Sequence, residues 1–144
     1  MSKFTLAAAE RIVAAAYAKG KELGLKPLTV AVLDAGGHVV VLSRQDGSSI
    51  LRPQIASGKA FGALAVGAGT RFLDAAAQTR PHFITALGQV SGGSIVPVPG
   101  GVLVRESAGG EVLGAVGISG DTSDMDEACA IAGIEAAGFA ADVG

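Results

Sequence analysis

Histidine is the residue type best suited to ligate a metal or to move a proton near neutral pH, and the chain has two histidines. His82 follows Pro81 in a stretch, Thr79–Phe83, that shows no clear helical or strand periodicity. An irregular stretch that combines arginine, histidine and phenylalanine is typical of a pocket rim. His82 is therefore a candidate ligand for a metal or haem iron, or a candidate acid–base group, with an ordinary surface or structural histidine as the alternative. His38 falls in a predicted turn, where we expect a solvated side chain.

Three cationic side chains are candidates for holding an anionic group. Lys59 lies on a predicted helix among small and apolar residues. Its ammonium either faces a pocket that holds a propionate, carboxylate or phosphate, or reaches solvent along its own stem. Arg52 and Arg105 are further candidates, with solvated positions as the alternative. Ser94 and the Pro99–Gly101 stretch are expected to shape a site where backbone N–H groups meet a ligand.

Several nucleotide-binding and nucleophile motifs are absent from the sequence. The stretch Ser57–Ala60 lacks the leading glycine and the final Ser or Thr of a phosphate-binding loop, and no G-x-G-x-x-G follows a predicted strand. Neither Ser94 nor Ser119 sits in the G-x-S-x-G pattern of an esterase. Cys129 lies among alanines and isoleucine in a predicted helix, so we expect a small buried residue rather than a nucleophile.

Four carboxylates gather just before and within the start of the last predicted helix: Asp121, Asp124, Asp126 and Glu127. Their spacing does not match that of a calcium-binding loop, which alternates oxygen ligands around an obligatory glycine. We expect Asp124, Asp126 and Glu127 to favour the positive N-terminal end of this helix, with Ser123 as its cap. Weak cation binding at the surface is the alternative.

Composition indicates one domain, residues 1–144, whose surface is poorly covered by charge. Hydrophobic residues make up 49% of the chain and charged residues 17%, against roughly 25% in a typical soluble domain. We therefore expect the chain to self-associate as a homo-oligomer. The net charge of −2, with scattered Lys and Arg, predicts neither a nucleic-acid nor a membrane partner.

The single cysteine excludes an intramolecular disulfide and a multi-cysteine metal site, and no other metal-ligand cluster stands out. Glu10 and Arg11 interrupt the first apolar run, which therefore resembles neither a secretory signal nor a membrane span. A cytoplasmic location is the resulting expectation.

Periodicity predicts an α+β domain in which an antiparallel sheet of about five strands packs against helices. A helix capped by Thr5 runs to about Leu23, and Gly24 stops it. The remaining predicted segments are strands at 28–33, 39–44, 102–106 and 112–119, an edge-like extended stretch at 95–99, and helices at about 52–67, 72–77, 82–87 and 123–140.

The hairpin of residues 100–120 organises the rest of the chain. Its second strand, 112–119, is almost wholly apolar, which predicts cover on both faces of the sheet. Gly114 and Gly117 lie inside this strand, and glycines in such positions mark the close approach of another backbone or of a ligand.

Four motifs in this sequence resemble the GlcG/HbpS-like family, which includes haem-binding proteins and the C-terminal domain of PduO-type proteins. The resemblance spans essentially the whole chain. The matching stretches are Val30–Val39 with Ser43–Gly47, Ser57–Ala60, Val98–Val102, and Gly110–Gly120 with Asp126 and Glu127.

The resemblance implies a profilin-like fold and homo-oligomers from dimers upward. Some family members bind haem, and some of those serve in redox sensing or corrinoid-linked metabolism, whereas many others are encoded beside catabolic genes. Among the matching residues only Lys59 looks chemically active. The stretch Arg71–Gly93, which contains His82, departs from the family pattern and is expected to carry this protein's own specificity.

Two ligand-dependent functions follow as hypotheses, and an oligomeric scaffold without a ligand is a third possibility. In the first, the protein binds haem or a related tetrapyrrole in an accessory or sensing role, with His82 as axial ligand and Lys59, Arg52 or Arg105 at the propionates. In the second, it is a cofactor-free isomerase, hydratase or lyase acting on a small carboxylated or oxygenated metabolite. There Lys59 and Arg105 hold the anion, and His82 or a carboxylate moves the proton.

Overall fold

The computed structural model describes residues 4–144, and within them the chain forms five α-helices and a five-stranded antiparallel sheet. This confirms the predicted α+β class. The helices are α1 (Leu6–Glu22), α2 (Arg52–Val66), α3 (Arg71–Thr79), α4 (Pro81–Val90) and α5 (Ser123–Ala136). The strands are β1 (Thr29–Asp34), β2 (Val39–Arg44), β3 (Gly101–Arg105), β4 (Val112–Ser119) and β5 (Ala140–Asp142).

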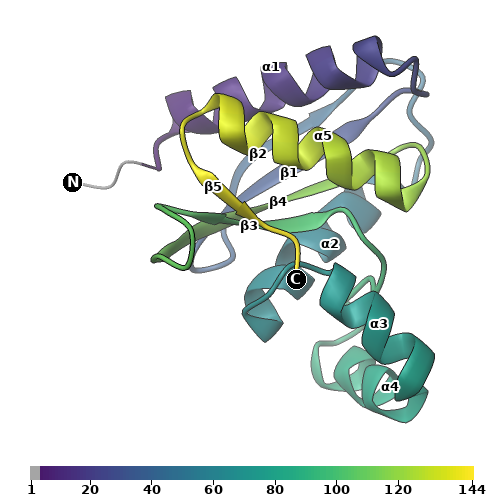
Figure 1. Ribbon diagram of the computed structural model, residues 1–144. Coiled ribbons are helices and arrows are strands. Elements are labelled where there is room, and N and C mark those ends of the chain that lie inside the picture. Colours follow the sequence, from purple (N-terminus) through teal and green to yellow (C-terminus); the bar gives the residue numbers. More distant parts are fainter. Residues whose placement is uncertain (1–3) are drawn as a thin grey trace.

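The sheet separates two layers of helices (Figure 1). Helices α1 and α5 lie side by side on one face, and α2 covers the other. The strand order is β2-β1-β4-β3-β5, so the predicted hairpins β1–β2 and β3–β4 meet where β1 pairs with β4 at the centre. The larger core lies between the sheet and the α1–α5 layer, and a smaller one lies under α2.

The first helix begins and ends where its sequence predicts. The Thr5 hydroxyl accepts a hydrogen bond from the Ala8 backbone N–H at 3.1 Å, which satisfies one unpaired donor of the first turn. The helix ends at Glu22, and Gly24 adopts a φ of +68° that favours glycine.

The fifth strand is not the one that the sequence predicts. The stretch 95–99 forms no strand, and the edge next to β3 is taken by β5, where Val104 pairs with Ala141. The last helix ends at Ala136 rather than near Ala140, because Gly138, with a φ of +88°, reverses the chain. This reversal brings Phe139 edge-on to Phe4, with ring centroids 5.7 Å apart.

Helix α2 lies directly on the sheet because two glycines leave room for its backbone. A Cβ on Gly117 would collide with the carbonyl oxygen of Ala56, and a Cβ on Gly101 would collide with that of Lys59. The glycine prediction for β4 is therefore confirmed as an approach of backbone to backbone.

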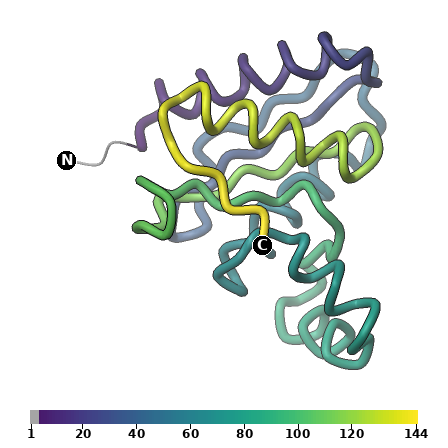
Figure 2. The backbone as a smooth tube through the Cα atoms, in the orientation of Figure 1, coloured from purple at the N-terminus to yellow at the C-terminus, as the bar shows by residue number. Residues whose placement is uncertain are grey.

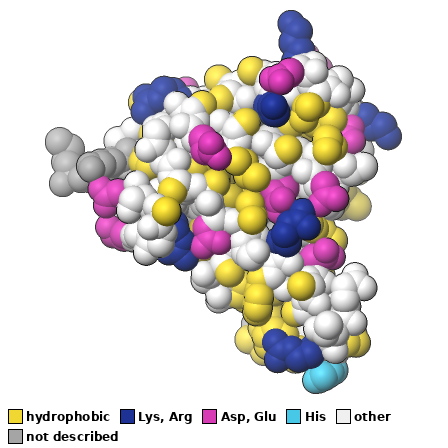
Figure 3. All heavy atoms as spheres, viewed as in Figure 1, with side chains coloured by type: hydrophobic (Ala, Val, Ile, Leu, Met, Phe, Trp, Pro, Cys, Tyr) yellow, Lys and Arg dark blue, Asp and Glu magenta, His cyan; other side chains and the backbone are white. Residues whose placement is uncertain are grey.

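Helices α3 and α4 confirm the two short helices predicted for the middle of the chain, and together they project from the sheet (Figures 1 and 2). No residue of α4 is fully buried, although its sequence is largely apolar. Figure 3 shows hydrophobic side chains on the surface of this projecting part. The C-terminal segment ends beside the start of α3, where the Arg71 N–H donates to the Val143 carbonyl at 3.2 Å (Figure 2).

Within residues 4–144, none of the helices combines the length and the apolar character needed to cross a membrane.

Candidate functional site

An open hollow of about 400 Å³ lies where three parts of the fold meet, namely the β1–β2 hairpin, the outer side of α2 and the loop after α4. Apolar side chains from all three parts form much of its wall, and the polar side-chain groups of its lining are one amide and two serine hydroxyls. The lining residues are Leu33, Gly37, Val39, Gln54, Ser57, Gly58, Phe61, Gly93, Ser94 and Val96. None of these carries a charge.

Helical spacing gives α2 a buried side and a side that faces the hollow. Ala56, Ala60 and Ala63 are fully buried against the sheet. Gln54 and Phe61 are exposed and lie seven residues apart, on the same side of the helix.

Gly58 lets the loop after α4 close one wall of the hollow. A Cβ at this position would lie 2.7 Å from the Val96 Cγ2 and 3.0 Å from the Ser94 carbonyl oxygen. Any larger residue at position 58 would therefore push the loop away from the helix. Ser94, which the sequence places in a candidate site, does line the hollow.

The tight turn between β1 and β2 forms the rim of the hollow and holds a histidine–carboxylate pair. The Asp34 Oδ1 accepts hydrogen bonds from the backbone N–H groups of Gly36, at 2.9 Å, and His38, at 3.0 Å. The same oxygen lies 3.1 Å from the His38 Nδ1. Two neighbours of His38, Gly37 and Val39, line the hollow, while the His38 side chain itself is 81% exposed.

These contacts fix the charge of Asp34. The backbone N–H of His38, then that of Gly36 and the His38 ring, lower the pKa of Asp34 below its ordinary value. The carboxylate is therefore ionised at neutral pH, and the His38 Nδ1 must be the donor in their contact. In the neutral form of the imidazole, the lone pair is then on Nε2.

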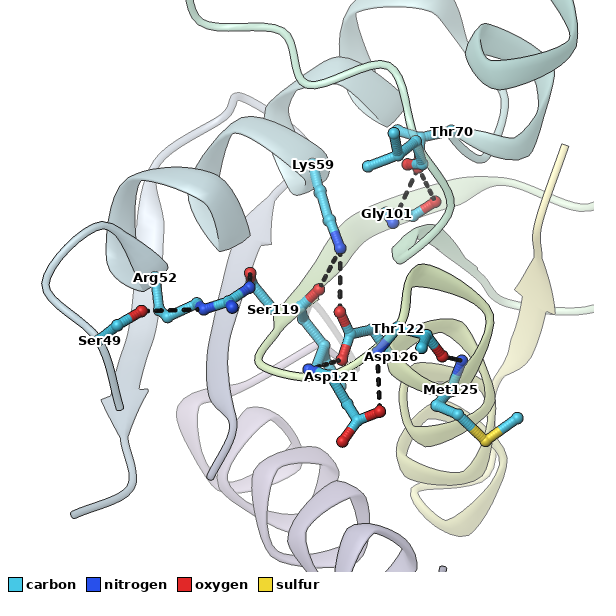
Figure 4. A network of polar contacts seen from close by, with 12 residues as sticks. Ser49, Arg52, Lys59, Thr70, Gly101, Ser119, Asp121, Thr122, Met125 and Asp126 are labelled. Carbon is cyan, nitrogen blue, oxygen red and sulfur yellow. Dashed lines mark hydrogen bonds and ion pairs between the residues drawn. The ribbon is translucent and has the colours of Figure 1, made fainter. Parts of the chain in front are cut away.

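Lys59 lines none of the hollows described for residues 4–144, and its ammonium does not reach solvent, so its position matches neither of the two expected alternatives. Its side chain is 3% exposed, and its Nζ donates to the Ile118 carbonyl at 2.9 Å and to the Asp126 Oδ2 at 3.2 Å (Figure 4). Burial lowers the pKa of Lys59 and raises the pKa of Asp126, and the attraction between the two groups opposes both shifts. This contact ties α2 to the end of β4 and to α5.

Arg52 lies close to this network but has neutral partners of its own. Its Nη1 donates to the Ser119 Oγ at 3.0 Å, and its Nε donates to the Ser49 Oγ at 3.1 Å (Figure 4). It lines a separate, smaller hollow of about 150 Å³ together with Lys26. An anion-binding role for Arg52 stays a prediction.

Arg105 lies at the opposite end of β3 from the Lys59 contact. Its Nε donates to the Asp142 Oδ2 at 2.8 Å, and its Nη1 donates to the Gly110 carbonyl at 2.8 Å. The guanidinium thus joins β3 to β5 and to the hairpin turn. The structure brings Arg52 and Lys59 near the same end of β4, but it does not bring Arg105 to them.

His82 is exposed in the first turn of α4, and none of the hollows described for residues 4–144 includes it among its lining. The expected pocket rim is instead the start of a helix, where the Arg80 guanidinium stacks 4.4 Å from the centroid of the Phe83 ring. Ligation of a metal by His82 stays a prediction that this geometry does not favour.

The acidic cluster at the start of α5 has structural partners. Thr122, not Ser123, is the N-cap, and its hydroxyl accepts from the Met125 N–H. Arg71 pairs with Asp124 at 2.6 Å and with Glu127 at 2.9 Å, which fixes α3 against α5. Asp126 is the buried partner of Lys59. A lysine on an apolar helix needs such a counter-charge, and this is the signal that could have linked the two residues.

The comparisons with known proteins agree with one another. A family model described as "Haem degrading protein HbpS-like" matches residues 4–135. A relative from Citrobacter freundii, described as an uncharacterized 15.0 kDa protein in the dhaT-dhaS intergenic region, is 32% identical over 126 residues. The match covers 88% of this chain and 86% of the relative.

Three solved structures have the same fold. A complex of PduOC with haem has a TM-score of 0.85 at 24% identity, covering 96% of this chain and 97% of that one. The ORFY protein of Klebsiella pneumoniae has a TM-score of 0.84 at 28% identity, covering 95% and 96%. A double mutant of Streptomyces reticuli HbpS has a TM-score of 0.79 at 29% identity, covering 94% and 87%. With the family model matching nearly the whole length, these likenesses confirm the resemblance seen in the sequence: the chain belongs to the HbpS-like family.

Proposed function

We propose that this protein binds haem or a related tetrapyrrole, and that the ligand enters the hollow between the β1–β2 hairpin, α2 and the loop after α4. The observation that carries the proposal is the uncharged and largely apolar wall of that hollow, to which Leu33, Val39, Phe61 and Val96 contribute. A flat macrocycle gains most from such a surface. Membership in the HbpS-like family supports the choice of ligand.

The residues present fit the macrocycle better than its propionates. Apolar side chains and the Phe61 ring can pack on its faces, and an imidazole stands on the rim. Among the described residues, those that line the hollow include no lysine, arginine or histidine. Lys59 and Arg105 lie elsewhere and are paired with Asp126 and Asp142. The propionates would therefore extend into solvent. Bound haem would supply a redox-active iron, consistent with an accessory or sensing role.

Titration with hemin tests the proposal, with two matched variants on one strand. Val39 is 59% exposed and lines the hollow, whereas Leu42 is 47% exposed and does not. Val39→Asp places a charge against the macrocycle and should weaken binding at least about tenfold. Leu42→Asp should leave the affinity unchanged. Equal binding by both variants, or no saturable change in the Soret band of the wild type, would reject the proposal.

A second function, cofactor-free acid–base chemistry on a small metabolite, draws its support from the Asp34–His38 pair. A carboxylate that fixes an imidazole beside a hollow is an arrangement suited to proton transfer. The uncharged lining favours an oxygenated rather than a carboxylated substrate. Turnover of such a compound by hemin-free protein, abolished in His38→Ala, would support this function over the first.

A further inference from the structure

We propose that the small hollow beside the start of α2 binds a phosphate group, free or as part of a small ester, and that Arg52 and Lys26 hold it. The hollow has a volume of about 150 Å³ and is separate from the one assigned to the tetrapyrrole. The proposal therefore stands apart from the proposed function.

The lining of this hollow combines two cations with hydroxyl groups, and none of its described residues is a carboxylate. Lys26 comes from the loop before β1, Ser48 and Ser49 follow β2, and Arg52 opens α2. Ammonium, guanidinium and hydroxyl groups are the side-chain donors that oxyanions bind. The lining is thus suited to an anion, unlike the uncharged lining of the larger apolar hollow.

The guanidinium of Arg52 is oriented without being neutralised. Its Nε donates to the Ser49 Oγ at 3.1 Å and its Nη1 donates to the Ser119 Oγ at 3.0 Å, and both acceptors are neutral (Figure 4). Within residues 4–144, Nη2 makes no recorded hydrogen bond and no carboxylate forms an ion pair with Arg52. A planar group held in this way keeps N–H donors for two phosphate oxygens.

Ser49 and Lys26 supply the other donors. The Ser49 Oγ accepts the Arg52 Nε hydrogen, and its own hydroxyl hydrogen is not used in that bond. The Lys26 backbone N–H donates to the Asp121 Oδ2 at 3.0 Å, which fixes the loop, while its side chain is exposed and forms no ion pair with any described residue. The ammonium is therefore available to an anion.

A neighbouring hollow of about 600 Å³ adds to the positive charge at this end of the molecule. It shares Lys26 with the smaller hollow, and its lining also contains Lys21 and Arg44. Asp46 is the one carboxylate among the described residues that line it. The remainder of a phosphate ester would extend toward this larger space.

Asp121 is the carboxylate that faces the two proposed ligands of the phosphate. The backbone N–H groups of Lys26 and Thr122 lower the pKa of Asp121, and the positive charges of Lys26 and Arg52 contribute to the same shift. The four cations around the two hollows and the two carboxylates, Asp46 and Asp121, leave a local charge of +2 in a chain whose net charge is −2. A phosphate group carries about −1.5 to −2 at pH 7, which matches this balance.

Helix geometry separates this site from the apolar hollow. Gln54 lines the apolar hollow, and Arg52 lies two positions earlier on α2. Two positions turn the helix by about 200°, so the two side chains leave on different sides of its first turn. We therefore expect the phosphate site to be occupied whether or not a tetrapyrrole is bound.

Calorimetric titration of the hemin-free protein with sodium phosphate at pH 8 and low ionic strength tests the proposal. The wild type should bind one phosphate per chain. Arg52→Gln should weaken binding at least about tenfold, and Lys26→Gln about threefold. Arg11→Gln removes an exposed cation of α1 that lines none of the hollows described for residues 4–144, and it should leave the affinity unchanged.

Circular dichroism checks that each variant is folded, and Lys26→Gln, an exposed substitution, keeps the test valid if Arg52→Gln does not fold. Competition by methyl phosphate would assign a phosphate ester, and its failure to compete would assign free phosphate. The absence of saturable binding by the wild type would overturn the site. Equal affinities in the wild type, Lys26→Gln and folded Arg52→Gln, or an equal loss in Arg11→Gln, would overturn the assignment of these residues.

Discussion

Asp34 makes no buried contact, yet one of its carboxylate oxygens fixes a turn and a ring together. Three donors converge on its Oδ1, two from the backbone and one from His38. Such donors favour the ionised form, which is why the pKa of Asp34 lies below its ordinary value. The conformation of the turn thus depends on a charge.

This dependence predicts how stability changes with pH. Because the pKa of Asp34 is lower in the folded than in the unfolded chain, the stabilisation is complete above the unfolded value, about 3.9, and is lost as the pH falls through the folded value. The free energy of unfolding of the wild type should therefore exceed that of Asp34→Ala near neutral pH, and the difference should shrink in stronger acid. Urea unfolding over this pH range measures the difference. A difference that stays constant in strong acid would show that the charge plays no part.

At the scale of elements, the Lys59–Asp126 pair joins three of them, because α2, β4 and α5 meet at one ammonium group (Figure 4). Both side chains are almost completely buried, at 3% and 1% exposure. Two buried charges in contact contribute little net stability over apolar replacements, but either one alone is costly. Removal of either side chain alone should therefore destabilise the fold, because it leaves the other charge buried without a partner.

A double-mutant cycle tests this coupling. Asp126→Asn keeps an acceptor for the Asp121 N–H but leaves Lys59 without a counter-charge, and we expect a loss of about 3 kcal/mol in the free energy of unfolding. Lys59→Met should cost a similar amount. The double variant should lose clearly less than the sum, since neither charge then remains buried. Additive losses would show that the two residues act independently.

The elements with a strong local signal are the ones that the sequence predicts well. Gly36 and Gly37 mark the first hairpin, Thr5 marks the start of α1, and alternation and apolar runs mark the four longer strands. Strand β5 was missed because three residues are too few for a periodic pattern, and its edge position follows only from pairing with β3.

The candidate site was harder to predict because its parts are far apart in the sequence. The Lys59–Asp126 contact spans 67 positions, and the hollow combines residues from 33 to 96. The contact between Asp34 and His38 is an exception, because a local sequence pattern can predict it. An aspartate four residues before a histidine, across two glycines, is a local pattern that indicates a carboxylate bound to the turn and to the ring.

At the scale of the whole molecule, low charge and an uncovered helix lead to the same expectation. Charged residues are 17% of the chain, and the largely apolar helix α4 contains no fully buried residue. We propose that copies of the chain associate through α4, which would bury its apolar side chains.

Sedimentation equilibrium tests this association, with two exposed apolar residues as a matched pair. The wild type should sediment as a multiple of 14.1 kDa. Val90, on α4, is 86% exposed, and Ile50, outside the helices, is 88% exposed. Val90→Glu should lower the mass toward that of one chain, whereas Ile50→Glu should not. A wild type of 14.1 kDa at every concentration would contradict the proposal.

The close packing of α2 on Gly117 and Gly101 affects how a ligand can enter the hollow. The backbone of α2 already touches the strands beneath it, so the helix cannot move closer to the sheet. The loop after α4, on the other side of the hollow, is less closely packed. Its Gly92 and Gly93 adopt φ values of +69° and +82°, and an added Cβ at either position would meet no neighbour. If the hollow must widen to admit a ligand, the loop that contains Gly92 and Gly93 has free space around it, whereas α2 has none on the side of the sheet.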